Sequence, residues 1–400
     1  MSVLVDYSDD PSVAIPLSSE MIERLRRLAQ SYPKTVGTAL LDRSMYHGQL
    51  LSKFGRLKDA VDWLEGLGAK YHGLASTDAE IGQWYIELLL DLAHMLKDQG
   101  AMEKARVVLR RATETGSMHP NIGLVLSCVA KSHEADIVAC LGDSSPALNL
   151  STDCLSLALQ FYPLHDINIA LLQHQHSQLV AVNEIYEEAL SNAKDSATIM
   201  LNYITDDPAK LDRYRYHWLS EFWRVWASCL SDTNGPAPAL ILAGQGAKEA
   251  NRVKAALRKN LYLCKISESY LGLALWTLGS IQLFSRNTDD AQKSLEEAKE
   301  LWKARVEVRR FDLRNFALTL WALGFTYCLL GRHDDGASVH QELKKMINGL
   351  IYAEPTMHRV VKVALDQERR RPSWALFLEK VREELQCKHL MDVVPNAKIE

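Results

Sequence analysis

Apolar residues recur along most of the chain at intervals of three and four positions, the spacing that places them on one face of an α-helix. Proline and glycine interrupt this pattern, for example at Pro33, Pro163 and Pro355, and leave stretches of about 10–20 residues, the ordinary length of a globular helix. Alternating runs of β-branched residues are almost absent. The sequence therefore predicts an all-α fold. The clearest helical stretches are residues 21–29, 39–52, 58–67, 81–98 and 102–115.

Small residues recur within the helical pattern at a constant step of 45 positions. A fixed step of this kind indicates a repeat architecture, in which each repeat packs only on its neighbours. A small residue also lets two helices approach closely, so we expect Gly279 and Gly324 at close crossings within helix pairs. The residues related by this step are Gly48 and Ala93, Gly55 and Gly100, Ala60 and Ala105, Gly279 and Gly324, and Ala291 and Gly336.

Two kinds of segment carry a resemblance to a known family. Trp321-Ala-Leu-Gly-Phe-Thr-Tyr327 resembles the first half of the tetratricopeptide (TPR) pattern, W-x2-L-G-x2-Y. Ala291-x3-Leu295-x2-Ala298 and Ala105-x3-Leu109-x2-Ala112 resemble its second half. The resemblance implies a TPR-like α-solenoid of antiparallel helix pairs, with a 45-residue step longer than the family's usual 34 residues.

The resemblance also predicts a domain organisation. Residues 1–16 hold two prolines and several aspartates and are expected to form a flexible N-terminal tail. Residues 17–390 are expected to form a single TPR-like helical solenoid. Its expected parts are regular repeats over 39–115 and 218–346, a less regular middle over 121–217, and C-terminal capping helices over 350–390.

Composition and charge narrow the class of protein. Hydrophobic residues make up 47% of the chain, which argues against global disorder. The net charge of −4 gives no indication of a nucleic-acid partner. The seven cysteines form no CxxC pair and predict reduced thiols in a cytoplasmic, or alternatively nuclear, protein. The most apolar stretch, residues 270–284, is shorter than the roughly 20 residues needed to span a bilayer, so no membrane partner is expected.

Three aspartate pairs could belong to an all-helical, metal-dependent enzyme, in which carboxylates hold magnesium against a diphosphate. We favour helix capping, because Asp289-Asp290 and Asp334-Asp335 occupy the same position in successive repeats and Asp206-Asp207 precedes a proline. No phosphate-binding glycine loop or nucleophile elbow is present. His174 and His176 should point to different sides of a helix and cannot share a metal ion. We therefore predict no catalytic residue, no metal site and no cofactor.

The resemblance places the partner-binding surface on the first helix of each repeat. In the last two repeats the corresponding positions hold the five candidate partner-binding residues, Trp276, Ser280, Phe284, Trp321 and Phe325. In one reading these residues line an open concave groove for a protein or peptide. In the other, a C-terminal helix carrying Trp374 and Phe377 folds back over them, since solenoids need their last apolar face covered.

The predicted function is that of a non-catalytic scaffold or adaptor, which binds a peptide or protein partner in a concave groove. Two alternatives stay open at this point. One is the metal-dependent enzyme described above. The other is a sensor or regulatory module of a larger signalling assembly, because similar repeats form the ligand-sensing part of nucleotide-switched receptors.

Overall fold

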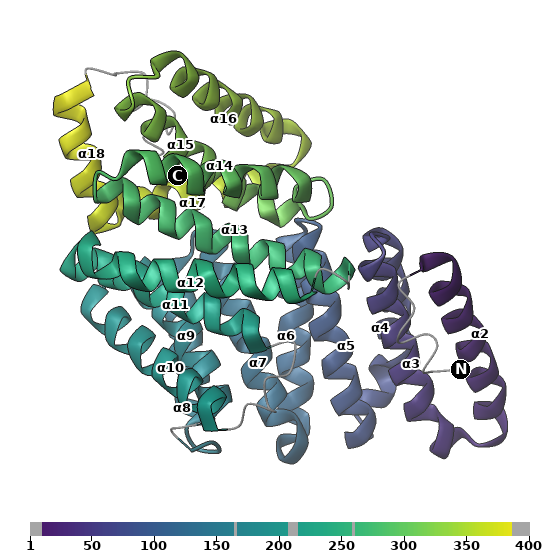
Figure 1. The fold of residues 1–400 in the computed structure, drawn as a ribbon. Coiled ribbons are helices and arrows are strands. Elements are labelled where there is room, and N and C mark those ends of the chain that lie inside the picture. Colours follow the sequence, from purple (N-terminus) through teal and green to yellow (C-terminus); the bar gives the residue numbers. More distant parts are fainter. Residues whose placement is uncertain (1–9, 164–165, 207–214, 258–260, 386–400) are drawn as a thin grey trace. The chain divides into compact units, whose positions relative to one another are not determined.

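The computed structural model describes residues 10–163, 166–206, 215–257 and 261–385. Of these residues 89% are α-helical, and none of them lies in a strand, which confirms the predicted all-α class (Figure 1). The α-helices of the described ranges are α2 (Pro11–Ser31), α3 (Pro33–Lys53), α4 (Leu57–Ala75), α5 (Ala79–Asp98), α6 (Met102–Met118), α7 (Pro120–Cys140), α8 (Ser144–Ala158), α9 (Ile167–Val182), α10 (Tyr186–Asp206), α11 (Arg215–Asn234), α12 (Pro236–Leu257), α13 (Leu261–Phe284), α14 (Thr288–Arg305), α15 (Leu313–Leu329), α16 (His333–Ala353), α17 (Pro355–Arg370) and α18 (Pro372–Leu385).

The first described helix begins earlier than the sequence analysis expects. Residues 11–16, assigned there to a flexible tail, form the first turns of α2. Asp10 accepts a hydrogen bond from the backbone nitrogen of Ser12 at 2.9 Å, and Pro11 occupies the first helical position, where its missing N–H costs nothing. The prolines and aspartates of this segment therefore start a helix. Residues 1–9 lie outside the described part of the chain.

The chain divides into two compact units, residues 1–137 with 260–262, and residues 138–259 with 263–400. In the first unit α2 packs on α3, α3 on α4, α4 on α5 and α5 on α6. In the second unit α8 packs on α9, α9 on α10, α10 on α11 and α11 on α12, and α15 packs on both α14 and α16. Where the structure describes the connection, a short turn reverses the chain between successive helices, so that each unit is a TPR-like stack of antiparallel helix pairs (Figure 1). The predicted extent of a single solenoid and the 45-residue step remain predictions.

Three glycines allow the two helices of a pair to approach closely. A Cβ atom on Gly48 would lie 2.7 Å from a methyl carbon of Leu64, and one on Gly279 would lie 2.6 Å from Cγ of Leu295. A Cβ atom on Gly324 would overlap the imidazole ring of His340. Since real Cβ atoms do not come this close to other atoms, no larger residue fits without movement. The prediction that Gly279 and Gly324 lie at close crossings is confirmed.

The turns of three helix pairs, α3–α4, α5–α6 and α15–α16, use glycine for a different reason. Gly55, Gly100 and Gly331 have φ angles of 78°, 82° and 75°, in the left-handed region that other residues rarely adopt. Each glycine is the second residue after the first helix of its pair and lets the chain reverse into the second.

The aspartate pairs at the starts of α14 and α16 were expected to cap backbone N–H groups, and this expectation needs correction, because Asp290 accepts a hydrogen bond from Nδ2 of Asn287 at 2.8 Å and Asp335 bonds an arginine side chain. Asp59, at the start of α4, does the same as Asp335. Asp59 accepts a hydrogen bond from Nε of Arg56 at 2.6 Å, and Asp335 accepts one from Nε of Arg332 at 2.7 Å. Arg56 and Arg332 occupy the N-cap positions and make no side-chain cap. The carboxylates of Asp59 and Asp335 therefore pair with the arginine three residues earlier, while remaining near the positive end of the helix dipole.

Helix α15 is enclosed by its neighbours. Every residue from 315 to 328 is buried, so this helix has no solvent-facing side. It packs on α14, α16 and α17, and α17 in turn contacts α18. None of the described helices combines the length and the apolarity that crossing a bilayer requires.

Candidate functional site

The five candidate partner-binding residues come from two helices of the second unit. Trp276, Ser280 and Phe284 follow one another at four-residue spacing on α13, and Trp321 and Phe325 do so on α15, so each set shares one side of its helix. Trp276, Ser280, Trp321 and Phe325 are buried, with at most 6% of their surface exposed, and Phe284 is partly buried. We call Phe284, Trp321 and Phe325 the aromatic face.

Helix α18 covers the aromatic face. The ring centre of Trp374 lies 4.5 Å from that of Trp321 and 4.9 Å from that of Phe284. Phe377 lies 5.7 Å from Phe284 and 6.0 Å from Phe325. Most of these pairs are tilted or edge-to-face, the geometries that aromatic rings prefer. The structure thus has the arrangement in which a C-terminal helix folds back over these positions.

Trp276 and Ser280 precede Phe284 on α13. Unlike the residues of the aromatic face, each has a buried polar side-chain atom without a hydrogen-bond partner among the described residues. These atoms are the indole nitrogen of Trp276 and the hydroxyl oxygen of Ser280. The ring contacts described for α18 involve neither of them. The role of all five residues in binding a partner stays a prediction.

A group of polar residues holds the beginning of α18, and we call it the polar anchor: Asp232, Glu368, Arg371 and Ser373. The carboxylate of Asp232, near the end of α11, is fully buried. It accepts hydrogen bonds from Nε of Arg371 at 2.8 Å and from the backbone nitrogen and hydroxyl of Ser373. Glu368 accepts a further bond from Arg371 at 3.3 Å. A carboxylate at this position satisfies free N–H groups of α18 and faces the positive end of its dipole.

The polar anchor holds two carboxylates around one guanidinium, and the pKa values of Glu368 and Arg371 are shifted there. Burial raises the pKa of Glu368; the neighbouring Arg371 opposes this, and the negative charge of Asp232 adds to it. Burial would lower the pKa of Arg371, but Asp232 and Glu368 together raise it, so this side chain is firmly charged. Burial, assisted by the charge of Asp232, also raises the pKa of the nearby Tyr186 to about 12.

The polar anchor is not visible in the sequence. Asp232 and Arg371 are separated by 139 positions, and neither lies in a motif. The one local signal is Pro372-Ser373, because proline and serine are favoured at the start of a helix.

A second buried polar cluster lies on α9 and α11. Arg224 donates from Nε to Glu221 at 2.7 Å, and His174 lies 3.8 Å from the same carboxylate and stacks on Phe222. Burial pushes the pKa of Glu221 up, but Arg224 and His174 hold it far below its ordinary value, and burial lowers the pKa of His174. The cluster is a network of charged and polar side chains between two helices.

His176 turns to another part of the unit. Its Nδ1 atom lies 3.0 Å from the hydroxyl of Ser151 on α8, whereas His174 faces α11. The prediction that these two histidines point apart is confirmed. Within the described residues no group of three or more His, Cys, Asp or Glu side chains could hold a metal ion. Asp207, from one of the aspartate pairs, lies outside those residues.

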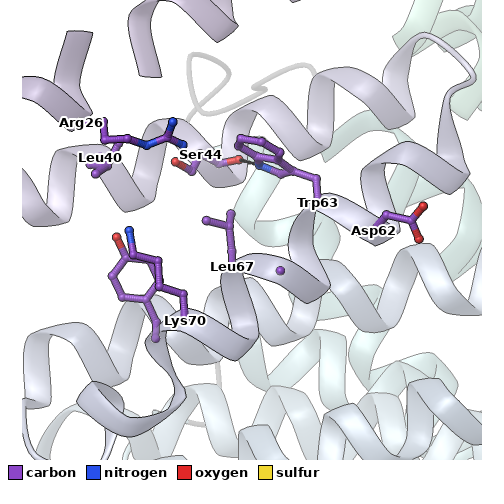
Figure 2. Close-up of a pocket in the computed structure, with 9 residues that line it drawn as sticks. Arg26, Leu40, Ser44, Asp62, Trp63, Leu67 and Lys70 are labelled. Carbon is purple, nitrogen blue, oxygen red and sulfur yellow. Dashed lines mark hydrogen bonds between the residues drawn. The ribbon is translucent and has the colours of Figure 1, made fainter. Parts of the chain in front are cut away.

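The first unit contains a small open pocket of about 260 Å³ between α2, α3 and α4. Figure 2 shows Trp63 directed toward the backbone of Ser44, to whose carbonyl oxygen it donates a hydrogen bond of 2.7 Å. Burial raises the pKa of Tyr71 at this pocket, and the charge of Arg26 opposes the shift. The pocket is smaller than most sites for small organic ligands, about 300–1,000 Å³. Its lining is Arg26, Leu40, Ser44, Asp62, Trp63, Gly66, Leu67, Lys70 and Tyr71.

Comparison with known proteins finds likeness in structure only. No protein-family model and no curated protein matches the sequence. Among solved structures, NprR in complex with its cognate peptide NprX is similar over 86% of this chain and 94% of its own, with 12% identity and a TM-score of 0.49. A Rap protein complexed with competence and sporulation factor is similar over 88% and 99%, with 10% identity and a TM-score of 0.48. BtubC from P. vanneervenii is similar over 74% and 92%, with 12% identity and a TM-score of 0.36. The TPR-like fold therefore rests on the helix pairs of this chain itself.

Proposed function

We propose that this chain is a non-catalytic interaction scaffold in the cytoplasm or nucleus, and that it binds a peptide or protein partner at the side of α13 and α15 that carries Trp276, Ser280, Phe284, Trp321 and Phe325. One observation supports the proposal above others: the aromatic face already holds a helical segment, α18, through ring contacts between 4.5 and 6.4 Å. Large aromatic side chains gathered on one face provide much of the free energy in helix and peptide recognition.

The test compares two single substitutions in the full chain. Trp321→Ala removes a ring from the centre of the aromatic face, whereas Tyr352→Ala changes a side chain on α16 that is 93% exposed. Proteins that copurify with the native chain are identified by mass spectrometry, and their binding to each purified variant is measured by calorimetry. We expect Trp321→Ala to weaken partner binding at least tenfold and Tyr352→Ala to leave it unchanged, with circular dichroism as the check on folding.

Equal binding by the native chain and a folded Trp321→Ala chain would remove the aromatic face from the function. Partner loss in both variants alike would show that binding depends on some other property of the protein.

A further inference from the structure

The contacts of α18 with the aromatic face and the polar anchor indicate which kind of helix this surface recognises. Two contacts hold the helix, and they lie close together along it. Trp374 and Phe377, three residues apart and therefore on one side of the helix, pack on the aromatic face. Arg371 and Ser373, at the start of the helix, bind Asp232.

Among residues 372–381 of α18, whose side chains the structure describes, the opposite side is exposed. Ala375, Leu376, Glu379 and Lys380 are exposed, and Leu376 has 53% of its surface in solvent. The buried side consists of Trp374, Phe377, Leu378 and Val381. Recognition therefore uses one apolar side of an amphipathic helix together with its first turn.

Asp232 makes this recognition selective for charge. Among the described residues, the hydrogen bonds to its carboxylate all come from positions 371 and 373. An apolar helix placed on the aromatic face without a cation at its start would bury this carboxylate unpaired, which is strongly unfavourable. Any occupant of the site therefore has to bring a positive side chain next to its first turn.

We propose that the aromatic face and Asp232 together form a binding site for an amphipathic helix of a partner protein, with an arginine just before the first helical turn and an aromatic pair three residues apart. Helix α18 then occupies the site within the free chain, and the partner has to displace it. This inference rests on the proposed function, since it specifies the partner and the regulation of the same site.

Exchange requires that α18 can leave the site, and the helix is a separable element. It spans 14 residues and is joined to α17 through Arg371 alone. Isolated helices of about this length are marginal in water, so its helical state depends on docking. Because α18 is tethered, its effective concentration at the site is high, on the order of millimolar, and a partner has to overcome that advantage.

The test uses a fluorescein-labelled peptide of residues 369–385 as the probe and measures anisotropy with the full chain. In a Trp374→Ala chain the resident helix is weakened while the aromatic face is intact. We expect the peptide to bind this chain at least tenfold more tightly than the native chain. A Leu376→Ala chain is the matched control, because Leu376 lies on the exposed side of the same helix, and it should behave as native.

The same assay examines which features of the peptide matter. Peptides carrying Arg371→Gln or Trp374→Ala should bind the Trp374→Ala chain at least tenfold more weakly than the native peptide, and a peptide carrying Leu376→Ala should bind as the native one does. If Asp232→Asn is added to the chain, the native and Arg371→Gln peptides should bind alike. If the Trp374→Ala chain loses its helical circular-dichroism signal, Phe377→Leu replaces it in every comparison.

Three results would overturn the inference. The first is no peptide binding to a folded variant chain, and the second is equal binding to the native and variant chains. The third is a dimer that exchanges α18, detected by light scattering, because the occupant would then be a second copy of this chain. Its failure differs from failure of the proposed function. A partner that depends on Trp321 but is not displaced by the peptide leaves the scaffold proposal intact and rejects this one.

Discussion

Replacing Gly324 with alanine tests the packing on which the helix pairs depend. The added methyl group would fall on the imidazole ring of His340, 2.6 Å from its Cδ2 atom. The ring has little room to withdraw, because His340 is 3% exposed and the ring of Phe325 lies 5.6 Å away. The two helices have to move apart, or His340 has to leave its position.

The expected magnitude combines two opposing terms. Alanine is preferred over glycine inside a helix by about 0.5–1 kcal/mol. Overpacking of a well-packed core costs about 1–3 kcal/mol. Gly349→Ala in α16 isolates the first term, since Gly349 is exposed and a Cβ there meets no atom within 4 Å. We therefore expect Gly349→Ala to stabilise the protein slightly and Gly324→Ala to destabilise it, with about 1–3 kcal/mol between the two variants.

Urea unfolding followed by circular dichroism measures this difference. With a denaturant slope of about 2 kcal/mol per molar, the two midpoints should differ by roughly 0.5–1.5 M. Adding His340→Ala to Gly324→Ala should cost less than the sum of the two single substitutions, because it removes the side chain that the new methyl group strikes. A Gly324→Ala chain as stable as the Gly349→Ala chain would refute the assignment of Gly324 to a close crossing.

Three further outcomes are expected. Because the pKa of Glu368 is raised in the folded state, its ionisation destabilises the fold, and Glu368→Gln should be more stable than native at pH 8. This advantage should disappear below about pH 4.5, the ordinary pKa of a glutamate, where Glu368 is protonated in both states. Urea unfolding across this pH range would measure it. In the native chain the buried Asp312 pairs with Arg305 at 2.9 Å. Arg305→Met removes this cation and should lower the free energy of unfolding, measured in urea, by about 3–5 kcal/mol. An equally stable variant would contradict the buried pair. Trp63→Phe loses the hydrogen bond to the Ser44 carbonyl and should lower stability by about 0.5–1.5 kcal/mol by the same method.

The helix pairs were predictable because their determinants are local. Gly279 and Gly324 lie within a few residues of the apolar positions that define their helices, so their spacing is visible in the sequence. The side-chain bonds at helix starts were less predictable. Asp335 pairs with Arg332, where a carboxylate bonded to backbone N–H groups was expected. A helical pattern identifies the first turn but does not decide which donor a carboxylate will take.

The site was predictable only in its apolar part. The aromatic positions of α13 and α15 follow from repeat spacing, and a covering C-terminal helix was one of two readings of the same residues. The contact of Asp232 with Arg371 could not be derived, because two charged residues 139 positions apart carry no mutual signal in a single sequence. The extra specificity that we assign to the site depends on this contact.

The enclosure of α15 affects how the chain can fold during synthesis. This helix has no side suited to water, yet the residues that complete its cover, Trp374 and Phe377, are made after it. At roughly 5–20 residues per second, translation needs about 2–10 s to proceed from Phe325 to Trp374. During that interval the aromatic rings of α13 and α15 have no α18 to shield them, so a nascent chain at this stage is a substrate for chaperones. A message truncated between these two residues would yield a product whose exposed aromatic rings favour aggregation.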